Sequence, residues 1–484
     1  MPQKNTPYEV KIPHSSGFDM SHRNSGSLTC GTLTPLLVEE CIPGTKCNLR
    51  TNIAVQLPPL VSDTYMNLKL KVEAFCIPMR LLCRSFEDWF NDFPKRTLSF
   101  ASATSSSTGR VYTNVKAKLP VLRLPASVSS SVYKPGSLLD YLGFKVESIT
   151  ADYVDISPLS LFAYHLVYQE FYRNPRVQNP AFVEDLGISG SASSSVSRLP
   201  SIIYKYFCQT DNLVQDNSLI NLTDVNLNYM KLADGVGLFD LRQRNFGYDF
   251  FTGARPSAQQ GNAAQVSIAL PEGAETTGFS IAQLRAANSL QMFRERNRIP
   301  SPRFVDQLYA RYGVRPSDGV AQRPILIGSA TYDVISRGVD QTGGVSEGAS
   351  PFNSVGSQYG RAYGVGSDFI IDNFEVVEPS FIMVLQSLVP EVTYSSGVAP
   401  YLRRYIAEGS VTEMATPLLQ NIGDEPIKAE MLSNDFDQET GNDVFGFQDR
   451  FGSFMFHSNE CHGLLRDGQS LESISALIGS SPIF

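Results

Sequence analysis

The sequence lacks what membrane insertion, signal-peptide secretion or a fibrous rod would require. No uncharged apolar run approaches the ~18 residues that a membrane-spanning helix needs. The first seventeen residues contain no apolar stretch of the kind found in signal peptides. There is neither a glycine period nor a sustained heptad, which excludes a collagen-like or coiled-coil rod. We therefore predict no membrane insertion and no secretion by that route.

Positive charge is also scarce. Lys and Arg total 40 against 48 Asp and Glu, so the formal net charge is −8. A protein that coats nucleic acid alone is usually basic or carries an obvious basic block. If this chain contacts DNA or RNA, another component must neutralise much of the phosphate charge.

The usual motifs of catalytic and metal sites are missing. The chain has no P-loop, no H-E-x-x-H and no G-x-S-x-G elbow. Its seven cysteines form no C-x-x-C pair and favour reduced, mostly buried thiols. His457, Cys461 and His462 would need a fourth ligand to hold a metal, and such spacing is common by accident. We predict that the protein is not an enzyme and has no catalytic residue, cofactor or metal site.

Alternation of apolar and polar residues gives the clearest structural signal. In residues 66–76 the apolar side chains fall on every second position, which predicts an antiparallel strand with one buried face. Further strands are predicted at 33–40, 52–57, 325–335, 369–377, 380–394 and 445–456. The sequence therefore predicts an all-β protein, and its 42% hydrophobic residues suffice for a large core.

Helices are few, and the connections between strands are long. We predict helices at 158–173, capped by Ser157, and at 281–296. Long polar segments at 98–137, 183–277 and 338–367 are predicted as outward insertions of a β-sandwich rather than separate domains. The glycine cluster Gly360, Gly364 and Gly366 lies in the last of these and is interpreted as part of a flexible loop.

Two groups of basic residues are candidates for phosphate contacts. One lies near the N-terminus, and the other surrounds the second predicted helix, where Arg285 and Arg303 also occur. The predicted nucleic-acid contacts are Lys4, Lys11, Arg23, Arg294, Arg296 and Arg298. The alternative is that these side chains pair with acids of the same or a neighbouring chain, as Glu295 beside its arginines suggests.

Several short motifs, spread in order from residue 18 to 451, together resemble one family. They are Phe18-Asp19-Met20-Ser21-His22, Leu37-Val38-Glu39-Glu40, Phe75-Cys76-Ile77-Pro78-Met79-Arg80-Leu81, Asp140-Tyr141-Leu142-Gly143, Tyr168-Gln169-Glu170-Phe171-Tyr172-Arg173, Tyr312-Gly313-Val314-Arg315-Pro316-Ser317-Asp318, Gln322-Arg323-Pro324 and Phe447-Gln448-Asp449-Arg450-Phe451. In these motifs the sequence resembles the major capsid proteins of microviruses, small single-stranded-DNA bacteriophages, and particularly their gokushovirus-like branch.

The resemblance implies a fold, an assembly and partners. The fold would be an eight-stranded antiparallel jelly roll with large loop insertions and a few short helices, a single capsid domain over 1–484. Copies would close into a T=1 icosahedral shell around circular single-stranded DNA, with a separate small basic DNA-binding protein inside. Residues 183–277 would form a protrusion at the threefold axes that contacts a host surface receptor. The protein would belong to the virion and assemble in the host cytoplasm.

A β-rich carbohydrate-binding or carbohydrate-active protein is the alternative reading. Such a protein would also be aromatic, acidic and rich in loops. It would need a site of clustered acidic and aromatic residues. Acidic pairs such as Asp424–Glu425 could supply the carboxylates, but such pairs are far more often solvated.

Overall fold

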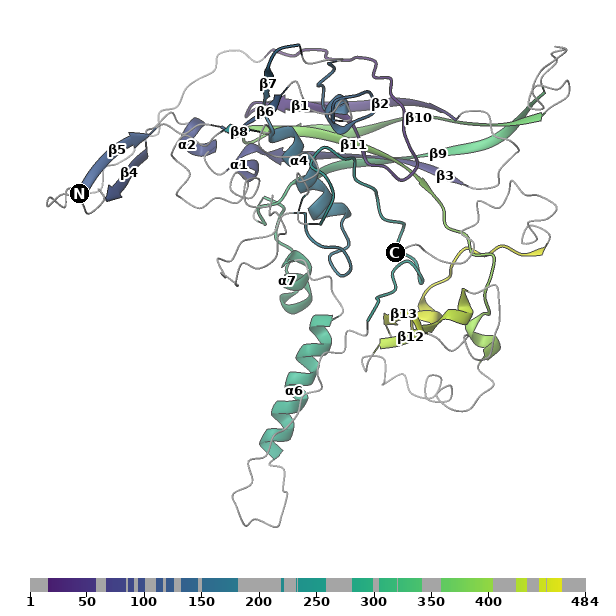
Figure 1. Cartoon of the computed structure of the whole chain (residues 1–484). Coiled ribbons are helices and arrows are strands. Elements are labelled where there is room, and N and C mark those ends of the chain that lie inside the picture. The colour runs from purple at the N-terminus through teal and green to yellow at the C-terminus, as the bar shows by residue number, and fades with distance from the viewer. Residues whose placement is uncertain are drawn as a thin grey trace, which may run out of the picture.

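A curled antiparallel sheet forms the centre of the computed structural model (Figure 1). The structure describes residues 16–57, 67–83, 86–90, 95–100, 110–115, 119–125, 132–146, 150–181, 219–221, 232, 234–257, 281–298, 304–319, 321–341, 358–403, 424–432, 444–449 and 451–463. The six strands of the sheet follow the order β1-β11-β3-β9-β10-β2. Their bounds are β1 Thr34–Cys41, β2 Lys46–Gln56, β3 Leu68–Pro78, β9 Ile325–Gln341, β10 Gln358–Glu375 and β11 Ser380–Pro390.

The strand order itself requires the sheet to curl. Strands β1 and β2 lie at opposite ends of the order. In a flat sheet, five strand spacings would separate them by about 24 Å. The chain joins them through residues 42–45, which span at most roughly 17 Å. Curling brings the two end strands back together and encloses a sandwich-like interior.

The two faces of the sheet bury different clusters of apolar side chains. The interior holds residues of all six strands, including Leu70 and Val72 of β3, Tyr332 of β9 and Ile371 of β10. The other face is covered by helix α4 (Leu159–Val167) and its neighbours, which pack on β3 and β11. Phe75 belongs to this second cluster and is buried. The alternation over 66–76 predicts one buried face and puts Phe75 with Lys69, Lys71 and Glu73 on the other, more polar face, so the prediction for Phe75 was wrong.

Glycines of β10 allow this strand and β9 to approach closely. The prediction of a flexible loop at Gly364 and Gly366 was wrong, because both lie in β10 paired with β2. A Cβ atom at Gly366 would lie 2.0 Å from the ring of Tyr332, and one at Gly364 would lie 2.9 Å from the carbonyl oxygen of Asp333. The glycines therefore leave room for β9 rather than giving the chain freedom.

Helix α4 confirms the first predicted helix. It runs from Leu159, and a π-helical turn over Tyr168–Tyr172 continues it. Pro158 rather than Ser157 is the residue preceding the first turn, and it caps the helix without a side-chain hydrogen bond. Nearly every residue of α4 is buried, because it lies between the sheet and the segments that cover it.

Smaller elements lie around the sheet. The remaining α-helices that the structure describes are α1 (Met79–Leu82), α2 (Phe86–Phe90), α3 (Leu138–Tyr141), α6 (Ile281–Arg298), α7 (Phe304–Tyr312) and α9 (Gly452–Met455). Three small sheets contain β4 (Lys95–Phe100) with β5 (Arg110–Val115), β6 (Val121–Pro125) with β7 (Tyr153–Ile156) and β8 (Leu219–Asn221), and β12 (Asp424–Lys428) with β13 (Val444–Asp449). Figure 1 shows α6 extending away from the central sheet and β12 and β13 to one side of it.

The strand pattern of the sequence is confirmed at its main points. All six strands of the central sheet were predicted, although β2, β9 and β10 are longer than expected. The predicted strand at 445–456 was wrong in its second half: β13 ends at Asp449 and α9 follows. The all-β, jelly-roll type of sandwich with few short helices is confirmed, with six described strands in the curled sheet.

Candidate interaction surfaces

Residues 234–257, here called the anchor segment, pack into the body of the protein. They fall within the predicted insertion at 183–277, of which the rest lies mostly outside the described residues. In the anchor segment Leu238 is fully buried, and the exposed fractions of Arg242 and Arg255 are 2% and 1%. Each of its arginines reaches a different part of the fold, which ties the segment in place.

Arg244 joins the anchor segment to the central sheet. Its guanidinium donates to both carboxylate oxygens of Glu73 in β3, over 2.7 and 3.1 Å. The hydroxyl of Tyr172 donates to the same carboxylate. Burial raises the pKa of Glu73, but the hydrogen bonds and charge of Arg244 and the Tyr172 bond outweigh it, so the pKa is lowered. Glu73 therefore stays ionised in the folded protein at neutral pH.

Arg242 joins the anchor segment to helix α4. It forms an ion pair with Asp234, and its Nε donates to Nδ1 of the fully buried His165 over 3.0 Å. His165 Nε2 in turn donates to the Leu238 carbonyl oxygen over 2.7 Å, so the imidazole is neutral and protonated on Nε2. Burial, and then the charge of Arg242, lower the pKa of His165 to about 3. This histidine is a structural link with no access to solvent.

Arg255 joins the anchor segment to the β12–β13 hairpin. Its Nη2 donates to Asp424 and to Asp449, each over 2.8 Å. The backbones of Arg255 and Phe447 also exchange two hydrogen bonds of 2.8 Å. Asp424 is therefore a buried structural carboxylate rather than half of a solvated acidic pair.

The structure places the predicted nucleic-acid contacts in different regions. Arg23 is exposed in an extended segment before β1. Arg294, Arg296 and Arg298 belong to α6, but their side chains lie outside the described part, as do Lys4 and Lys11 entirely. The described residues thus bring none of these side chains together with another.

Large apolar side chains are exposed on several elements. On the outer surface of β10, Tyr363, Val365 and Phe369 are 55%, 76% and 60% exposed. Arg50 of β2 stacks its guanidinium 5.2 Å from the Phe369 ring. Helix α6 has a further group, described below. Exposed apolar surface of this kind is typical of contact with other molecules.

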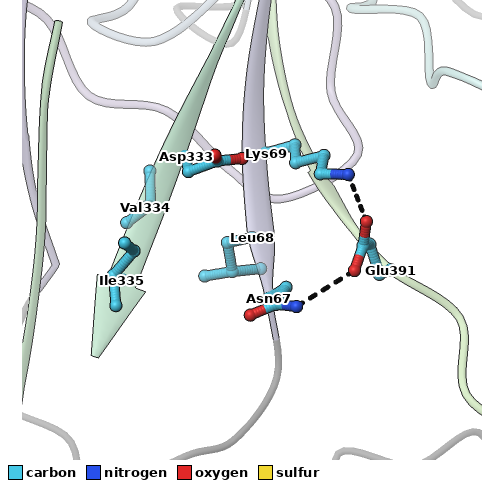
Figure 2. Close-up of a pocket in the computed structure, with 7 residues that line it drawn as sticks. All are labelled: Asn67, Leu68, Lys69, Asp333, Val334, Ile335 and Glu391. Carbon is cyan, nitrogen blue, oxygen red and sulfur yellow. Dashed lines mark hydrogen bonds and ion pairs between the residues drawn. The ribbon is translucent and has the colours of Figure 1, made fainter. Parts of the chain in front are cut away.

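The described residues form a pocket beside the beginning of β3 and the middle of β9 (Figure 2). Its volume is about 230 Å³, and Asn67, Lys69, Asp333 and Glu391 supply its polar side chains. Glu391 forms an ion pair with Lys69 and accepts a hydrogen bond from Asn67 at 3.1 Å. Lys69 and Glu391 neutralise each other, and we assign the pocket no chemistry.

The thiols and the metal candidates show no reactive arrangement in the described part. The six described cysteines are free, but only Cys76 and Cys83 are buried, so burial of most thiols was wrong for the described cysteines. Burial, and then the neighbouring Cys47, raise the pKa of Cys41 to about 12, which makes its thiolate scarce. Among the described residues no group of three His, Cys, Asp or Glu could hold a metal ion. None of the helices that the structure describes is long and apolar enough to cross a membrane.

Nearly the whole chain is similar to one known protein family. The family described as "Capsid protein (F protein)" matches residues 10–476. The chain belongs to this family of phage capsid proteins. The capsid protein is therefore a structural component of a virion, and its work is to assemble with copies of itself into a shell.

Capsid proteins of three phages show the same relationship over nearly the whole chain. The capsid protein is 23% identical to "Capsid protein VP1" of Chlamydia phage 1, covering 93% of this chain and 84% of that one. The identity is 22% to "Capsid protein VP1" of Bdellovibrio phage phiMH2K, with 93% and 82% covered. It is 24% to "Capsid protein VP1" of Spiroplasma virus 4, with 95% and 84% covered. The resemblance to microvirus capsid proteins is confirmed, and these relatives favour it over the carbohydrate-active alternative.

Sequence reasoning missed the ion-pair links of the capsid protein. Glu73 lies 171 residues from Arg244, and Arg255 lies 169 residues from Asp424. Two signals were present: an acid within an otherwise buried strand, and His165 on the apolar stripe of a helix. Each signal indicates a buried polar group, but neither identifies its distant partner.

Proposed function

We propose that this capsid protein closes into a T=1 icosahedral shell around a circular single-stranded DNA genome. The observation that carries the proposal is the family match over residues 10–476, which assigns nearly the whole chain to the capsid role. The fold supports it, because a rigid curled sheet with long connections can bury surface on several sides. Such head-to-tail contacts close into a shell when their rotations close.

Electron microscopy of purified particles tests this proposal. We expect uniform small spheres whose reconstruction has one copy of the chain per icosahedral asymmetric unit. Nucleic acid released from them should resist exonucleases, because it is circular, and yield to a nuclease specific for single strands. A larger triangulation number, open tubes or double-stranded nucleic acid would contradict the proposal.

The acidic charge of the capsid protein supports the presence of a second, basic protein that binds the DNA inside the shell. Each copy contributes a formal charge of −8 to a space that already holds polyanionic DNA. A separate small basic protein neutralises the phosphates, and the N-terminal Lys4, Lys11 and Arg23 add local contacts. Arg23 is exposed, as such a contact needs. Host-cell cytoplasm, where subunits, DNA and this partner meet, is the place of assembly.

Protein analysis of purified particles tests whether a separate basic protein neutralises the DNA. Mass spectrometry should find a small basic protein besides the capsid protein, and particles made without it should contain little DNA. A Lys4→Gln, Lys11→Gln, Arg23→Gln variant should form shells that hold their DNA less tightly in high salt. Normal packaging without any basic partner would refute this part of the proposal.

Host recognition is assigned to the part of 183–277 that precedes the anchor segment. Its tract Ser189–Ser197 is rich in serine and suits an exposed, adaptable surface around the threefold axes. The arginines of the anchor segment are engaged within the subunit, so this segment is assigned no part in host recognition. Deleting 190–197 should leave the particle yield unchanged and lower adsorption to host cells. Unchanged adsorption would place the receptor contact elsewhere.

A further inference from the structure

Helix α6 is a basic, partly apolar arm that extends from the body of the capsid protein. It contains 18 residues and is therefore about 27 Å long. Figure 1 shows it pointing away from the central sheet, next to α7. Along it, Ile281 is 70% exposed, Leu284 61%, Leu290 45% and Met292 49%. This is a large exposure of apolar surface for one helix in a soluble subunit.

The apolar side chains of α6 lie on opposite sides of the helix. Successive residues are rotated by about 100°, so Ile281 and Leu290 point in opposite directions, while Met292 lies on the side of Ile281. A helix that packs on one surface has its apolar residues in a single stripe. A helix that is apolar on two sides is instead suited to being enclosed from both.

Helix α7, which lies next to α6, and the loop that follows it contact other parts of the subunit. In α7 the side chain of Val305 is buried, and Arg315 lies 4.8 Å from the ring of Tyr309. In the loop that follows, Arg323 forms an ion pair with Asp318 and lies 5.5 Å from the ring of Phe171 beside α4. Helix α7 therefore leads directly into a segment that contacts the body of the subunit.

The charge of α6 is opposite to that of the remaining chain. The helix has four arginines and one glutamate, which gives +3. Subtracting this from the total of −8 leaves −11 on the rest of the chain. The arm of one copy is thus attracted electrostatically to the body of another. DNA would also attract the arginines, but it offers nothing to cover exposed isoleucine and leucine on both sides.

We propose that α6 is an assembly arm that inserts between neighbouring copies of the capsid protein and is enclosed by them on both sides. The inference rests on the capsid role and names the part of the chain that carries the contact. The exposed apolar side chains are buried on assembly, while the arginines pair with acids of the neighbours. The arm of each copy then holds at least two other copies in register.

Oxidation of Met292 tests the arm without any substitution. Dilute hydrogen peroxide converts exposed methionine to its sulfoxide, and peptide mass spectrometry measures the rate at each site. We expect Met292 to oxidise readily in the isolated subunit and several-fold more slowly in particles. Met79 and Met383, which are buried in the subunit, are slow in both states and serve as internal references.

Particles emptied of DNA distinguish contact of the arm with neighbouring copies from contact with DNA. If neighbouring copies cover the arm, protection of Met292 persists in empty shells. If protection disappears with the DNA, the arm contacts nucleic acid and the inference is overturned. Equal oxidation in subunits and particles overturns it as well. Neither result concerns shell symmetry or genome type, so failure of the arm is distinct from failure of the proposed function.

A pair of substitutions on the arm provides a second test. Ile281→Ser with Leu290→Ser changes two exposed positions on opposite sides, so the isolated subunit should unfold at an unchanged temperature. We expect this variant to form far fewer closed particles than the wild type at the same concentration. Asn288→Ser, at an exposed polar position of the same helix, is the matched control and should assemble normally. Normal assembly of the double variant would overturn the inference.

Discussion

Gly328 of β9 lies directly against the backbone of Ile370 in β10. A Cβ atom at Gly328 would stand 1.7 Å from the Ile370 carbonyl oxygen. No rotamer change can relieve this contact, because both atoms belong to the backbone framework. The close approach of β9 and β10 at this point therefore depends on this glycine.

Gly328→Ala should destabilise the subunit by about 3 kcal/mol, because β9 and β10 must move apart to admit the methyl group. Chemical denaturation of the isolated subunit measures the loss of unfolding free energy. Gly319→Ala is the control, since nothing lies within 4 Å of a Cβ atom there. Equal stability of the two variants would show that β9 and β10 can move apart without loss of stability.

Glu73→Gln should cost about 3 kcal/mol of unfolding free energy at neutral pH, because it leaves the partly buried Arg244 without its countercharge. The pKa of Glu73 is lowered in the folded protein, so the ion pair contributes stability above the ordinary value of 4.5 and loses it as the pH falls further. The wild type should therefore lose more stability than the variant when the pH drops below 4.5. Parallel curves of stability against pH would contradict this.

Mild acid should weaken the subunit through His165. The folded pKa is about 3 and the ordinary value is 6.5, so between these values the unfolded chain binds a proton that the folded chain does not. The stability present above pH 6.5 should fall by about 1 kcal/mol for each pH unit below it. His165→Gln removes this titration, and its stability curve should be flatter from pH 6.5 to 5. A wild-type curve without slope in this range would show that His165 does not titrate as described.

Arg255→Met should release the β12–β13 hairpin, because it leaves the buried Asp424 without its arginine partner. Limited proteolysis should then cut within 424–463 much faster than in the wild type. Arg50→Met, which changes an exposed arginine on β2, should leave this rate unchanged. Equal cleavage in both variants would show that backbone pairing alone holds the hairpin.

Local patterns predicted the strands and the first helix well, since these depend on periodic burial that any single segment reveals. β3 shows this clearly: Leu68, Leu70 and Val72 all face the interior, as their alternation predicted. The first half of β10 was missed because its glycines suggest a loop, and only their contacts with Asp333 and Tyr332 on β9 explain them. The second predicted helix was found, but its sequence could not show that it stands away from the body.

The links of the anchor segment were beyond sequence reasoning for a related reason. Arg242, Arg244 and Arg255 appear as ordinary polar residues in a long region between strands. Their burial depends on His165, Glu73 and Asp424, which come from three distant elements. Periodicity reports which residues face inward within one element, and it contains no information about which distant group will neutralise a charge.

These three arginines also limit how this virus can change. Within 14 residues they tie the chain to the helical layer, the central sheet and the C-terminal hairpin, directly behind the region assigned to host recognition. Selection by new hosts can change residues 183–231, but a replacement at 242, 244 or 255 disturbs the whole subunit. Sequences of natural isolates should therefore diverge within 183–231 and be nearly uniform at positions 242, 244 and 255.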